Sequence, residues 1–274
     1  MTSASSAPPS GAVARSRSLG DFVGETFAIT AVEVRKLSRD PTELVARAVQ
    51  PALWLLVFGQ VFSRIRAIPT GDLSYLEFMA PGVLAQGVLF SAIFYGIAVI
   101  WERDLGIIHK LLASPASRLS LVLGKALAAA VRALPQAFII YLLAALLGVR
   151  LALRPGALLA VLLLVALGSA TFATFSLVVA CVVKTRERFM GIGQVLTMPL
   201  FFASNAIYPI DLMPGWLQSI ARGNPLTYLV DGLRATMIQS GPSHFGLATD
   251  AGAIVVVFAV LLVLAARLYP GLAR

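Results

Sequence analysis

Six segments of this chain are apolar over lengths that match the thickness of a lipid bilayer. A helix needs about 20 mostly apolar residues to cross the hydrocarbon core. Such runs lie at residues 44–62, 80–100, 126–149, 156–183, 189–208 and 246–266. Hydrophobic residues make up 58% of the chain and charged residues only 13%, which is about half the charged fraction of an ordinary soluble domain. The chain is therefore predicted to be an all-α, polytopic integral membrane protein with six transmembrane helices.

The distribution of basic residues predicts which side of the membrane each loop occupies. Fifteen Lys and Arg residues fall in the amino-terminal segment through Arg47, in residues 101–125, in residues 184–188, and after the sixth span. Six fall in the alternate loops. Arg132 lies inside the third span, where we expect it to reach the inner surface or to pair with Glu102 or Asp104. By the positive-inside rule, both termini are expected in the cytoplasm, with the chain in the plasma membrane.

Before the first span, the sequence predicts a tail and one surface helix. Residues 1–18 are rich in Ser, Ala and Pro and lack the apolar core of a signal peptide, so we expect a disordered cytoplasmic tail, followed by a membrane domain over residues 19–274. The next residues form an apolar helical stripe of Val23, Phe27, Ala31, Val34 and Leu37, opposed by Glu25, Lys36 and Arg39. This pattern predicts an amphipathic helix on the inner membrane surface that ends at Asp40-Pro41. A cytoplasmic stub with accidental periodicity is the alternative.

A dense charge cluster, residues 101–115, separates the second and third spans. Its apolar positions fall at i, i+4, i+7 and i+11, one stripe of a helix: Trp101, Leu105, Ile108 and Leu112. The remaining surface is filled by Glu102, Arg103, Asp104, His109 and Lys110. Such a helix is too charged to enter lipid, so we expect it at the membrane boundary as a contact surface for a soluble partner. Gly106 either permits close approach of that partner or merely ends a turn.

The loop before the last span, residues 209–244, contains eight Gly and Pro residues yet is rich in apolar side chains. Two short helices are predicted there, the second with Asn224 as N-cap and Pro225 at the first helical position. Asp231 and Arg234 lie three residues apart on the face opposite its apolar residues. We expect these helices either to re-enter the outer leaflet or to form a simple cap over the outer face.

The chain lacks the residues that several catalytic and binding functions would need. Gly124-Lys125-Ala126 has neither the preceding glycine nor the following hydroxyl of a phosphate-binding loop, so the chain is not expected to hydrolyse ATP. His109 and His244 are predicted on opposite sides of the membrane, which leaves no metal site and no histidine-activated nucleophile. The chain has a net charge of +9, but its basic residues form no continuous face, so nucleic acid is not an expected partner. Cys181 is expected to be a small buried hydrophobe.

Three stretches of sequence lie at defined positions relative to the six spans: before the first, after the second and before the sixth. They are EVRKLSRDP at residues 33–41, ERDLGIIHKLLASPASR at 102–118 and NPLTYLVDGLR at 224–234. Together they resemble the type-2 ABC transporter permeases, in particular the daunorubicin- and doxorubicin-resistance-like bacterial exporters. The first is similar to the surface helix before the first span, the second to the cytoplasmic segment with the coupling helix, and the third to the outer motif before the last span.

This resemblance implies a permease that pairs with a second permease copy, as a homodimer or a heterodimer, and that couples to two copies of a separate ATP-binding cassette subunit. ATP and magnesium would belong to that subunit, so this chain would hold no cofactor and have no catalytic site. The residues implied to couple to the ATPase are Glu102, Leu105, Gly106, Ile108 and Leu112, and those of the outer motif are Asn224, Pro225, Asp231 and Arg234. Asp104 and Ile107-Ile108-His109 stand where relatives often have Glu and Thr-Leu-Glu, which leaves partner choice and substrate open.

Composition gives the only guide to the substrate. Spans rich in Leu, Phe, Ala and Val favour a hydrophobic or amphipathic drug or lipid-like molecule over an ion or a sugar phosphate. The scattered polar residues expected along its path are Gln60, Gln86, Tyr95, Gln136, Tyr141, Gln194 and Asn205. Export of a polysaccharide or lipid-linked polymer, and a membrane assembly subunit that transports nothing, are the alternatives. A secondary transporter is disfavoured, because it would need an ion site within the spans and usually internal repeats.

Overall fold

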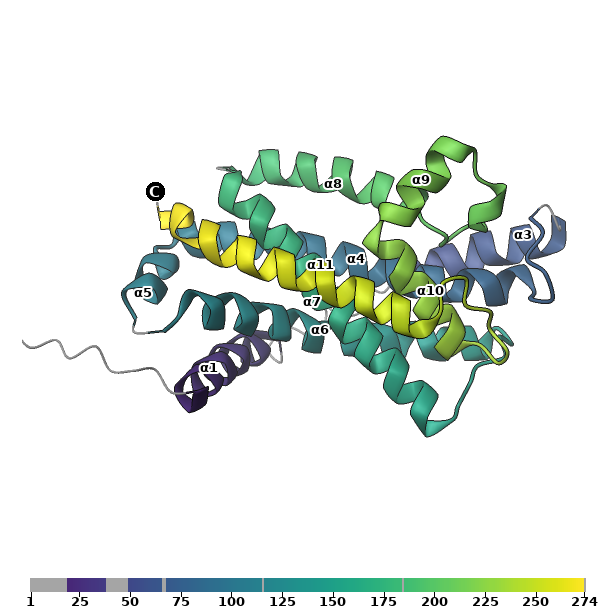
Figure 1. Ribbon diagram of the computed structural model, residues 1–274, viewed down its shortest axis with the longest axis horizontal. Helices are drawn as coiled ribbons and strands as arrows, with labels where there is room; N and C mark the ends of the chain where they lie inside the picture. Colours follow the sequence, from purple (N-terminus) through teal and green to yellow (C-terminus); the bar gives the residue numbers. More distant parts are fainter. Residues whose placement is uncertain (1–18, 38–48, 66–67, 115, 184, 274) are drawn as a thin grey trace, which may run out of the picture.

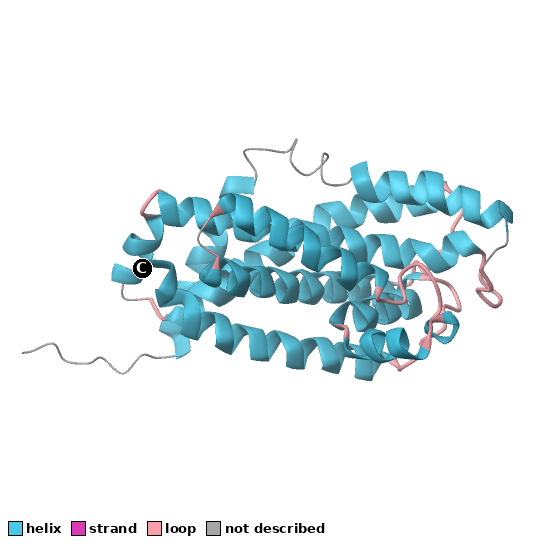
Figure 2. Ribbon diagram, turned by 90° about the horizontal axis from the view of Figure 1, so that it is seen from above, coloured by secondary structure: helices cyan, strands magenta, loops and turns pink. Residues whose placement is uncertain are grey.

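A computed structural model of the chain describes residues 19–37, 49–65, 68–114, 116–183 and 185–273. Within these ranges every named element is a helix, and the long helices run side by side along the long axis of the molecule (Figure 1). Seen from above, the loops gather mainly at the two ends of the bundle (Figure 2). The all-α prediction is thus confirmed for the described residues, and the predicted tail lies outside them.

The elements are, in order, α1 (Leu19–Leu37), η1 (Trp54–Gly59), α3 (Gln60–Ile65), α4 (Tyr75–Asp104), α5 (Ile107–Ala113), α6 (Arg118–Leu146), α7 (Pro155–Val182), α8 (Arg186–Phe202), η2 (Ile210–Leu212), α9 (Gly215–Gly223), α10 (Pro225–Met237), α11 (Leu247–Leu268) and η3 (Tyr269–Ala273). In the described ranges, four helices are long and apolar enough to cross a membrane: α4, α6, α7, and α11 continued into η3. They correspond to the second, third, fourth and sixth predicted spans.

The other two predicted spans are not found as complete membrane-length helices. The first begins among residues that the structure does not describe, and its described part is helical, with the π-helix η1 followed directly by α3. The fifth is shorter than predicted, because α8 ends at Phe202 after 17 residues, about 25 Å of helix. Pro199 lies in its last turn, and the chain then leaves the helix at Ala203. Four of the six predicted spans are therefore supported.

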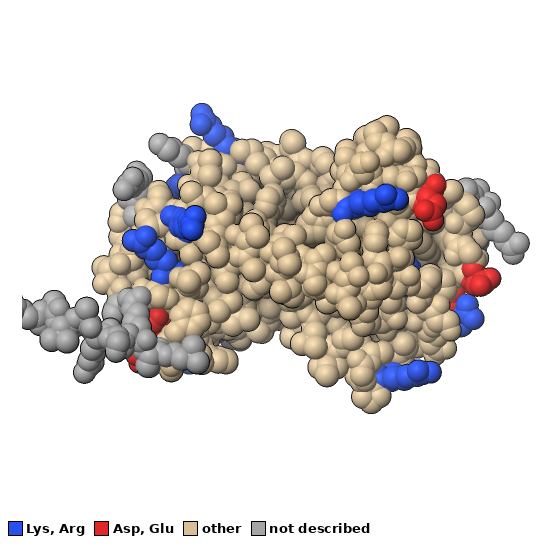
Figure 3. Space-filling view, viewed as in Figure 1, with Lys and Arg blue, Asp and Glu red and all other residues tan. Residues whose placement is uncertain are grey.

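Charged side chains on one face of the molecule lie away from its middle. On the face shown in Figure 3, Lys, Arg, Asp and Glu lie toward the two ends, and the middle carries none. Large apolar side chains are exposed on the long helices, among them Leu142 of α6, Leu163 of α7 and Val260 of α11. Such a surface is suited to hydrocarbon, because apolar side chains gain nothing from contact with water.

Small residues bring the central helices close together. The backbone N–H of Gly96 on α4 donates to Ser176 Oγ on α7 at 3.0 Å. A Cβ atom on Gly96 would overlap both Ser176 and the ring of Phe189, so only glycine fits there. Two turns earlier on the same face, α7 contacts α6, where Ser169 Oγ donates to the Ala129 carbonyl at 2.9 Å. Small residues and hydroxyl hydrogen bonds are the usual means by which helices associate in lipid, where apolar burial drives little.

Helix α1 lies against α6 with its polar side inward. Glu33 is buried, whereas Val23 is 45% and Phe27 65% exposed. Thr30 Oγ1 donates to the Gly124 carbonyl of α6 at 3.2 Å. The apolar stripe predicted from the sequence therefore points away from the protein, which is the orientation expected of a helix whose outer face meets lipid. The helix is packed on the bundle and is not an isolated stub.

Two short helices, α9 and α10, lie within residues 209–244 and have different surroundings. On α9, Trp216 is 68% exposed. α10 is enclosed by α4, α7 and α11, and its apolar residues Leu226, Leu229 and Leu233 are fully buried. Most of α10 is therefore inside the protein, with Pro225, Tyr228 and Ala235 only partly exposed, and its two charged residues are buried.

Candidate functional site

The 101–114 segment, which connects α4 to α6, is not the single helix that the sequence predicts. α4 ends at Asp104, Leu105 and Gly106 form a turn, and α5 begins at Ile107. Gly106 has a φ of +71°, in the left-handed region that residues with a Cβ atom rarely adopt. A Cβ there would meet nothing within 4 Å. Gly106 therefore ends a turn, which is one of its two expected roles; the close approach of a partner stays a prediction.

The break divides the predicted apolar stripe between two surfaces. Trp101 is 49% and Leu105 66% exposed. Ile108 is fully buried, and Leu112 packs partly against the same core. The prediction of one continuous stripe is therefore wrong, because the helical periodicity is interrupted at the turn. The first half of the stripe faces outward, and the second half fastens α5 to the chain's own helices.

The charged residues at the end of α4 are divided in the same way. Glu102, predicted on the polar surface, is only 8% exposed, so that prediction is corrected. Asp104 faces outward beside α8, where its Oδ2 lies 2.8 Å from Nη2 of Arg186. The guanidinium carbon of Arg186 also lies 3.5 Å from the ring centre of Trp101. The exposed side of the end of α4 is thus tied to the first residue of α8.

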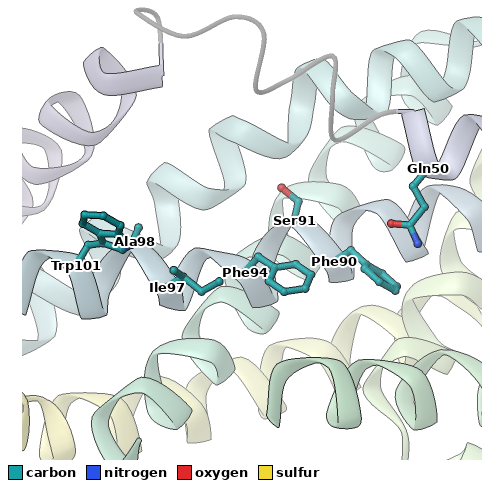
Figure 4. A pocket seen from close by; sticks show the side chains of 7 residues that line it. All are labelled: Gln50, Phe90, Ser91, Phe94, Ile97, Ala98 and Trp101. Atoms are coloured by element: carbon teal, nitrogen blue, oxygen red, sulfur yellow. The ribbon is translucent and has the colours of Figure 1, made fainter. Parts of the chain in front are cut away.

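A lateral groove of about 490 Å³ runs along α4 toward Trp101. Its lining residues are Gln50, Phe90, Ser91, Phe94, Ile97, Ala98 and Trp101. In Figure 4, six of these side chains follow one another along α4, and Gln50 lies on a separate helix. Phe90, Phe94 and Trp101 share one face of α4, because their spacing of four and then seven residues follows the helical repeat. The volume falls within the range of about 300–1,000 Å³ typical of small-molecule sites.

Sequence reasoning did not find this groove. The polar residues that it expected along a path are placed elsewhere: Gln86, Tyr95 and Gln136 are buried between helices. Tyr141 uses its hydroxyl to donate to the Ala152 carbonyl. The aromatic spacing on α4 was the available signal. An aromatic stripe on an apolar helix also fits core packing or lipid contact, so the pattern alone does not indicate a groove.

The first two residues of the outer motif shape the start of α10. Asn224 Oδ1 accepts a hydrogen bond from the Leu226 N–H at 3.0 Å, and its Nδ2 donates to the carbonyls of Leu200 and Ala203 at 2.7 and 2.9 Å. Pro225 occupies the first helical position, where no backbone N–H is needed. The predicted N-cap and proline positions are confirmed. The same asparagine also holds the end of α8 against the start of α10.

Asp231 fixes the conformation of the loop that precedes α11. Its Oδ2 accepts hydrogen bonds from the backbone N–H groups of His244 at 2.8 Å and Phe245 at 3.0 Å. Ser243 Oγ donates to the same oxygen at 3.0 Å. The residue is 1% exposed, so these donors compensate for the water that the carboxylate loses.

Arg234 joins α10 to α4 and to the turn after α8. Its Nη2 donates to the carbonyls of Asn205 at 2.7 Å and Phe78 at 3.3 Å, and its guanidinium carbon lies 3.9 Å from the Phe78 ring centre. Nη1 lies 4.0 Å from Asp231 Oδ1. Burial lowers the pKa of Arg234 to about 10, an effect that the charge of Asp231 opposes, so the side chain is still a cation at neutral pH. Asp231 and Arg234 share one side of α10, as predicted, but that side is inside the protein.

A protein-family profile and several named homologous proteins match most of the chain. The profile of the ABC-2 type transporter family matches residues 24–238, which include the 101–114 segment, the lateral groove and the outer motif. The ycf38 transport permease of Cyanophora paradoxa is 32% identical over 217 residues, 78% of this chain and 74% of that protein. The daunorubicin resistance ABC transporter permease protein DrrB1 of Streptomyces coeruleorubidus is 27% identical over 201 residues, 72% and 69% of the two chains. Nodulation protein J of Rhizobium meliloti is 28% identical over 206 residues, 74% and 77%.

Proposed function

The chain belongs to the ABC-2 type transporter family, and from this membership we propose that it is the permease subunit of an exporter that moves a hydrophobic or amphipathic compound, drug-like or lipid-like, out of the cell. In such transporters the permease is a multi-pass membrane protein and a separate subunit hydrolyses ATP. One observation carries the proposal. The lateral groove, apolar and large enough for a drug, ends at Trp101, where the exposed part of the 101–114 segment begins.

The lining of the groove favours a hydrophobic or amphipathic substrate. None of its seven residues is charged, and Phe90, Phe94 and Ile97 offer apolar surface. Burial of apolar surface contributes about 25 cal/mol per Å². Gln50 and Ser91 can hydrogen-bond the polar end of an amphipathic molecule. An ion or a sugar phosphate would lose its hydration there without gaining a charged partner.

The exposed part of the 101–114 segment is the proposed contact with the ATPase. Leu105, 66% exposed, presents apolar surface beside the Asp104–Arg186 ion pair. Because Ile108 and Leu112 fasten α5 to the bundle, a push at this turn is delivered to the protein's own helices. α4 is a single helix of 30 residues, about 45 Å long, so its displacement would change the shape of the groove along it.

The lateral groove is tested by filling it. Ala98 is an exposed residue of its lining, and Ala98→Trp would occupy the space that a substrate needs. We expect the variant to assemble with the ATPase normally and to lose transport of daunorubicin and of a fluorescent phospholipid into inside-out vesicles. Leu163→Trp, at a 61% exposed position of α7, is the matched control and should transport normally. Full transport by the Ala98 variant would rule out the groove as the path.

The ATPase contact is tested by one charge. Leu105→Asp would bury an unpaired carboxylate in the assembled interface, at a loss of several kcal/mol, so capture of the ATPase and transport should both fall while expression stays normal. Leu153, 68% exposed at the opposite end of the bundle, supplies the control Leu153→Asp. Normal assembly and transport by a well-expressed Leu105 variant would contradict the proposed contact.

The proposed complex contains two permease copies, identical or related, and two ATPase copies in the plasma membrane, with both permease termini in the cytoplasm. Support for the orientation comes from the excess of basic residues on one side. With Cys181→Ala as background, single cysteines are placed at exposed charged positions. Those at Asp72 and Arg154 should react with an impermeant thiol reagent in intact cells, and those at Lys110 and Glu187 only after permeabilisation. The reverse pattern would invert the orientation.

A further inference from the structure

Four charged side chains form an ion cluster inside the protein near the end of α4: Glu33, Glu102, Lys125 and Arg132. Lys125 Nζ lies 2.5 Å from Glu102 Oε2 and 3.2 Å from Glu33 Oε1, and Arg132 Nη2 lies 3.6 Å from Glu33 Oε2. The side chain of Lys125 is only 2% exposed. Arg132 is 16% exposed and pairs with Glu33. The sequence led us to expect that it reaches the inner surface or pairs with Glu102 or Asp104.

The ion cluster joins three helices. Glu33 lies on α1, Glu102 in the last turn of α4, and Lys125 and Arg132 two turns apart on α6. The charges alternate in space, in the order Glu102, Lys125, Glu33 and Arg132. Lys125 touches both carboxylates, so the path from the end of α4 to α1 within the ion cluster runs through its Nζ atom.

Buried charges are an inefficient way to stabilise helix packing. Each ion loses its hydration, and apolar residues of similar size often replace a buried ion pair without loss of stability. The ion cluster instead fixes the positions of the helices along one another, because each charge must stay beside its partner when little water is present. The ion cluster therefore constrains where the end of α4 lies relative to α1.

The location of the ion cluster relates this constraint to the 101–114 segment. Glu102 precedes the exposed Leu105 by three residues, within one turn of helix. On the other side, α1 is seated on α6 where Gly124 leaves room for Ile29, and Thr30 Oγ1 donates to the Gly124 carbonyl. Lys125 is thus placed between the end of α4 and α1, on the helix against which both pack.

We propose that Lys125 is a positioning residue for energy coupling: it fastens the end of α4 to α1, so that both helices move together when the ATPase displaces the 101–114 segment. This inference rests on the proposed function, because it requires an ATPase that pushes on the segment. It gives α1 a part in the transport cycle. The exposed Val23 and Phe27 of α1 would then move against lipid each time ATP binds.

The test removes the link without leaving an unpaired buried charge. Lys125→Met combined with Glu102→Gln keeps side-chain volume and leaves Glu33 paired with Arg132. Spin labels are attached to cysteines at Ala28, an exposed residue of α1, and at Glu187, an exposed residue of α8. In the complex with the ATPase, ATP binding should change the distance between the labels in the unaltered chain and leave it unchanged in the double variant. The thermal unfolding temperatures of the two are compared, because a merely structural role would lower that temperature without abolishing the distance change.

The matched control is Thr30→Val, which removes a polar contact between α1 and α6 that does not reach α4. It should keep the ATP-dependent distance change. A distance change in the double variant equal to that of the unaltered chain would overturn the role of Lys125 and leave the proposed function standing. If the double variant does not fold, Glu102→Gln alone is measured, and a full distance change in it would overturn the role equally. Failure of the unaltered chain to capture the ATPase would refute the proposed function and this inference with it.

Discussion

Two groups of buried charges are bonded in different ways. One lies where α1 and α6 meet the last turn of α4, and the other lies on α10, toward the other end of the bundle (Figure 1). In the ion cluster, side chains from α1, α4 and α6 pair with one another. The other group is the motif pair, Asp231 and Arg234 of α10, whose hydrogen-bond partners are mainly backbone groups. Those groups are the carbonyls of Phe78 and Asn205 and the N–H groups of His244 and Phe245.

This difference separates two uses of charge in one membrane protein. A side chain that bonds backbone groups holds the chain around it in one conformation, because a buried backbone group without a partner is costly. Side chains that bond one another hold two helices together without fixing the loops of either. We therefore expect the α10 end to be a rigid frame and the end that carries the ion cluster to transmit movement.

The largest loss of stability is expected when the motif pair is broken. Arg234→Met leaves the carbonyls of Phe78 and Asn205 without their donor and Asp231 without its cation, which should lower the free energy of unfolding by about 3–5 kcal/mol. Adding Asp231→Asn should not restore stability, because the two carbonyls still lack a partner. Thermal unfolding of both variants in one detergent measures the effect.

The ion cluster should respond in the opposite way. Lys125→Met leaves two carboxylates with fewer cations and should be strongly destabilising, but adding Glu102→Gln should recover most of the loss, since these side chains satisfy each other. Recovery by the second substitution at both ends, or at neither, would remove the distinction between backbone-bound and mutually bound charges.

Two glycines test the same contrast through packing, with an intermediate effect. A Cβ on Gly82 of α4 would overlap the backbone carbonyl of Ala206, whereas a Cβ on Gly124 of α6 would lie 2.7 Å from Cγ2 of Ile29, a side-chain atom of α1. Overpacking of this kind costs about 1–3 kcal/mol. Gly82→Ala should have a cost at the upper end of this range, because the turn held by Arg234 cannot move. Gly124→Ala should lose less stability, because α1 can shift.

Gly24→Ala, on α1, is the control for these two substitutions. A Cβ there meets nothing within 4 Å, so the higher helix propensity of alanine should leave stability unchanged or raise it by up to about 1 kcal/mol. Equal falls in the unfolding temperature for Gly82→Ala and Gly124→Ala would show that the two ends are equally rigid.

The outer region could be predicted largely from local signals. Asn224 caps the helix that Pro225 begins, and both effects act within a few residues along the chain, so the sequence reveals them. The long apolar helices α4, α6, α7 and α11 follow from the length of their apolar runs in the same way. The burial of Arg234 could not be foreseen, because it depends on three helices that enclose α10.

The other end was less predictable, because helical periodicity shows which residues share a face but not what that face meets. On α1 the apolar Phe27 points outward and Glu33 inward. Glu102 was expected on the surface, yet its cationic partner Lys125 lies 23 residues away on another helix. The turn at Gly106 depends on the backbone conformation of one residue, and the helical spacing of apolar residues does not reveal it. The lateral groove likewise depends on how separate helices lie side by side.

The smallest effect is expected at the exposed link of the end of α4. The Asp104–Arg186 ion pair is 2.8 Å long, with side chains 37% and 32% exposed, and exposed ion pairs contribute about 0–1 kcal/mol. A double-mutant cycle with Asp104→Asn and Arg186→Gln should give a coupling energy below about 1 kcal/mol, and the value should fall as salt is added because exposed charges are screened. Arg186 also stacks on Trp101, but that loss occurs in both arms of the cycle and cancels.

The same cycle at Lys125 and Glu102 should give a larger coupling energy that salt hardly changes, because those side chains are 2% and 10% exposed. The two cycles together compare the two sides on which the end of α4 is held. A stronger link on the buried side means that a push at Leu105 moves α4 with α6 and α1, while the contact with α8 gives way. Equal coupling energies, with equal dependence on salt, would mean that burial does not distinguish the two links, and α8 would then have as strong a claim as α1 to move with the 101–114 segment.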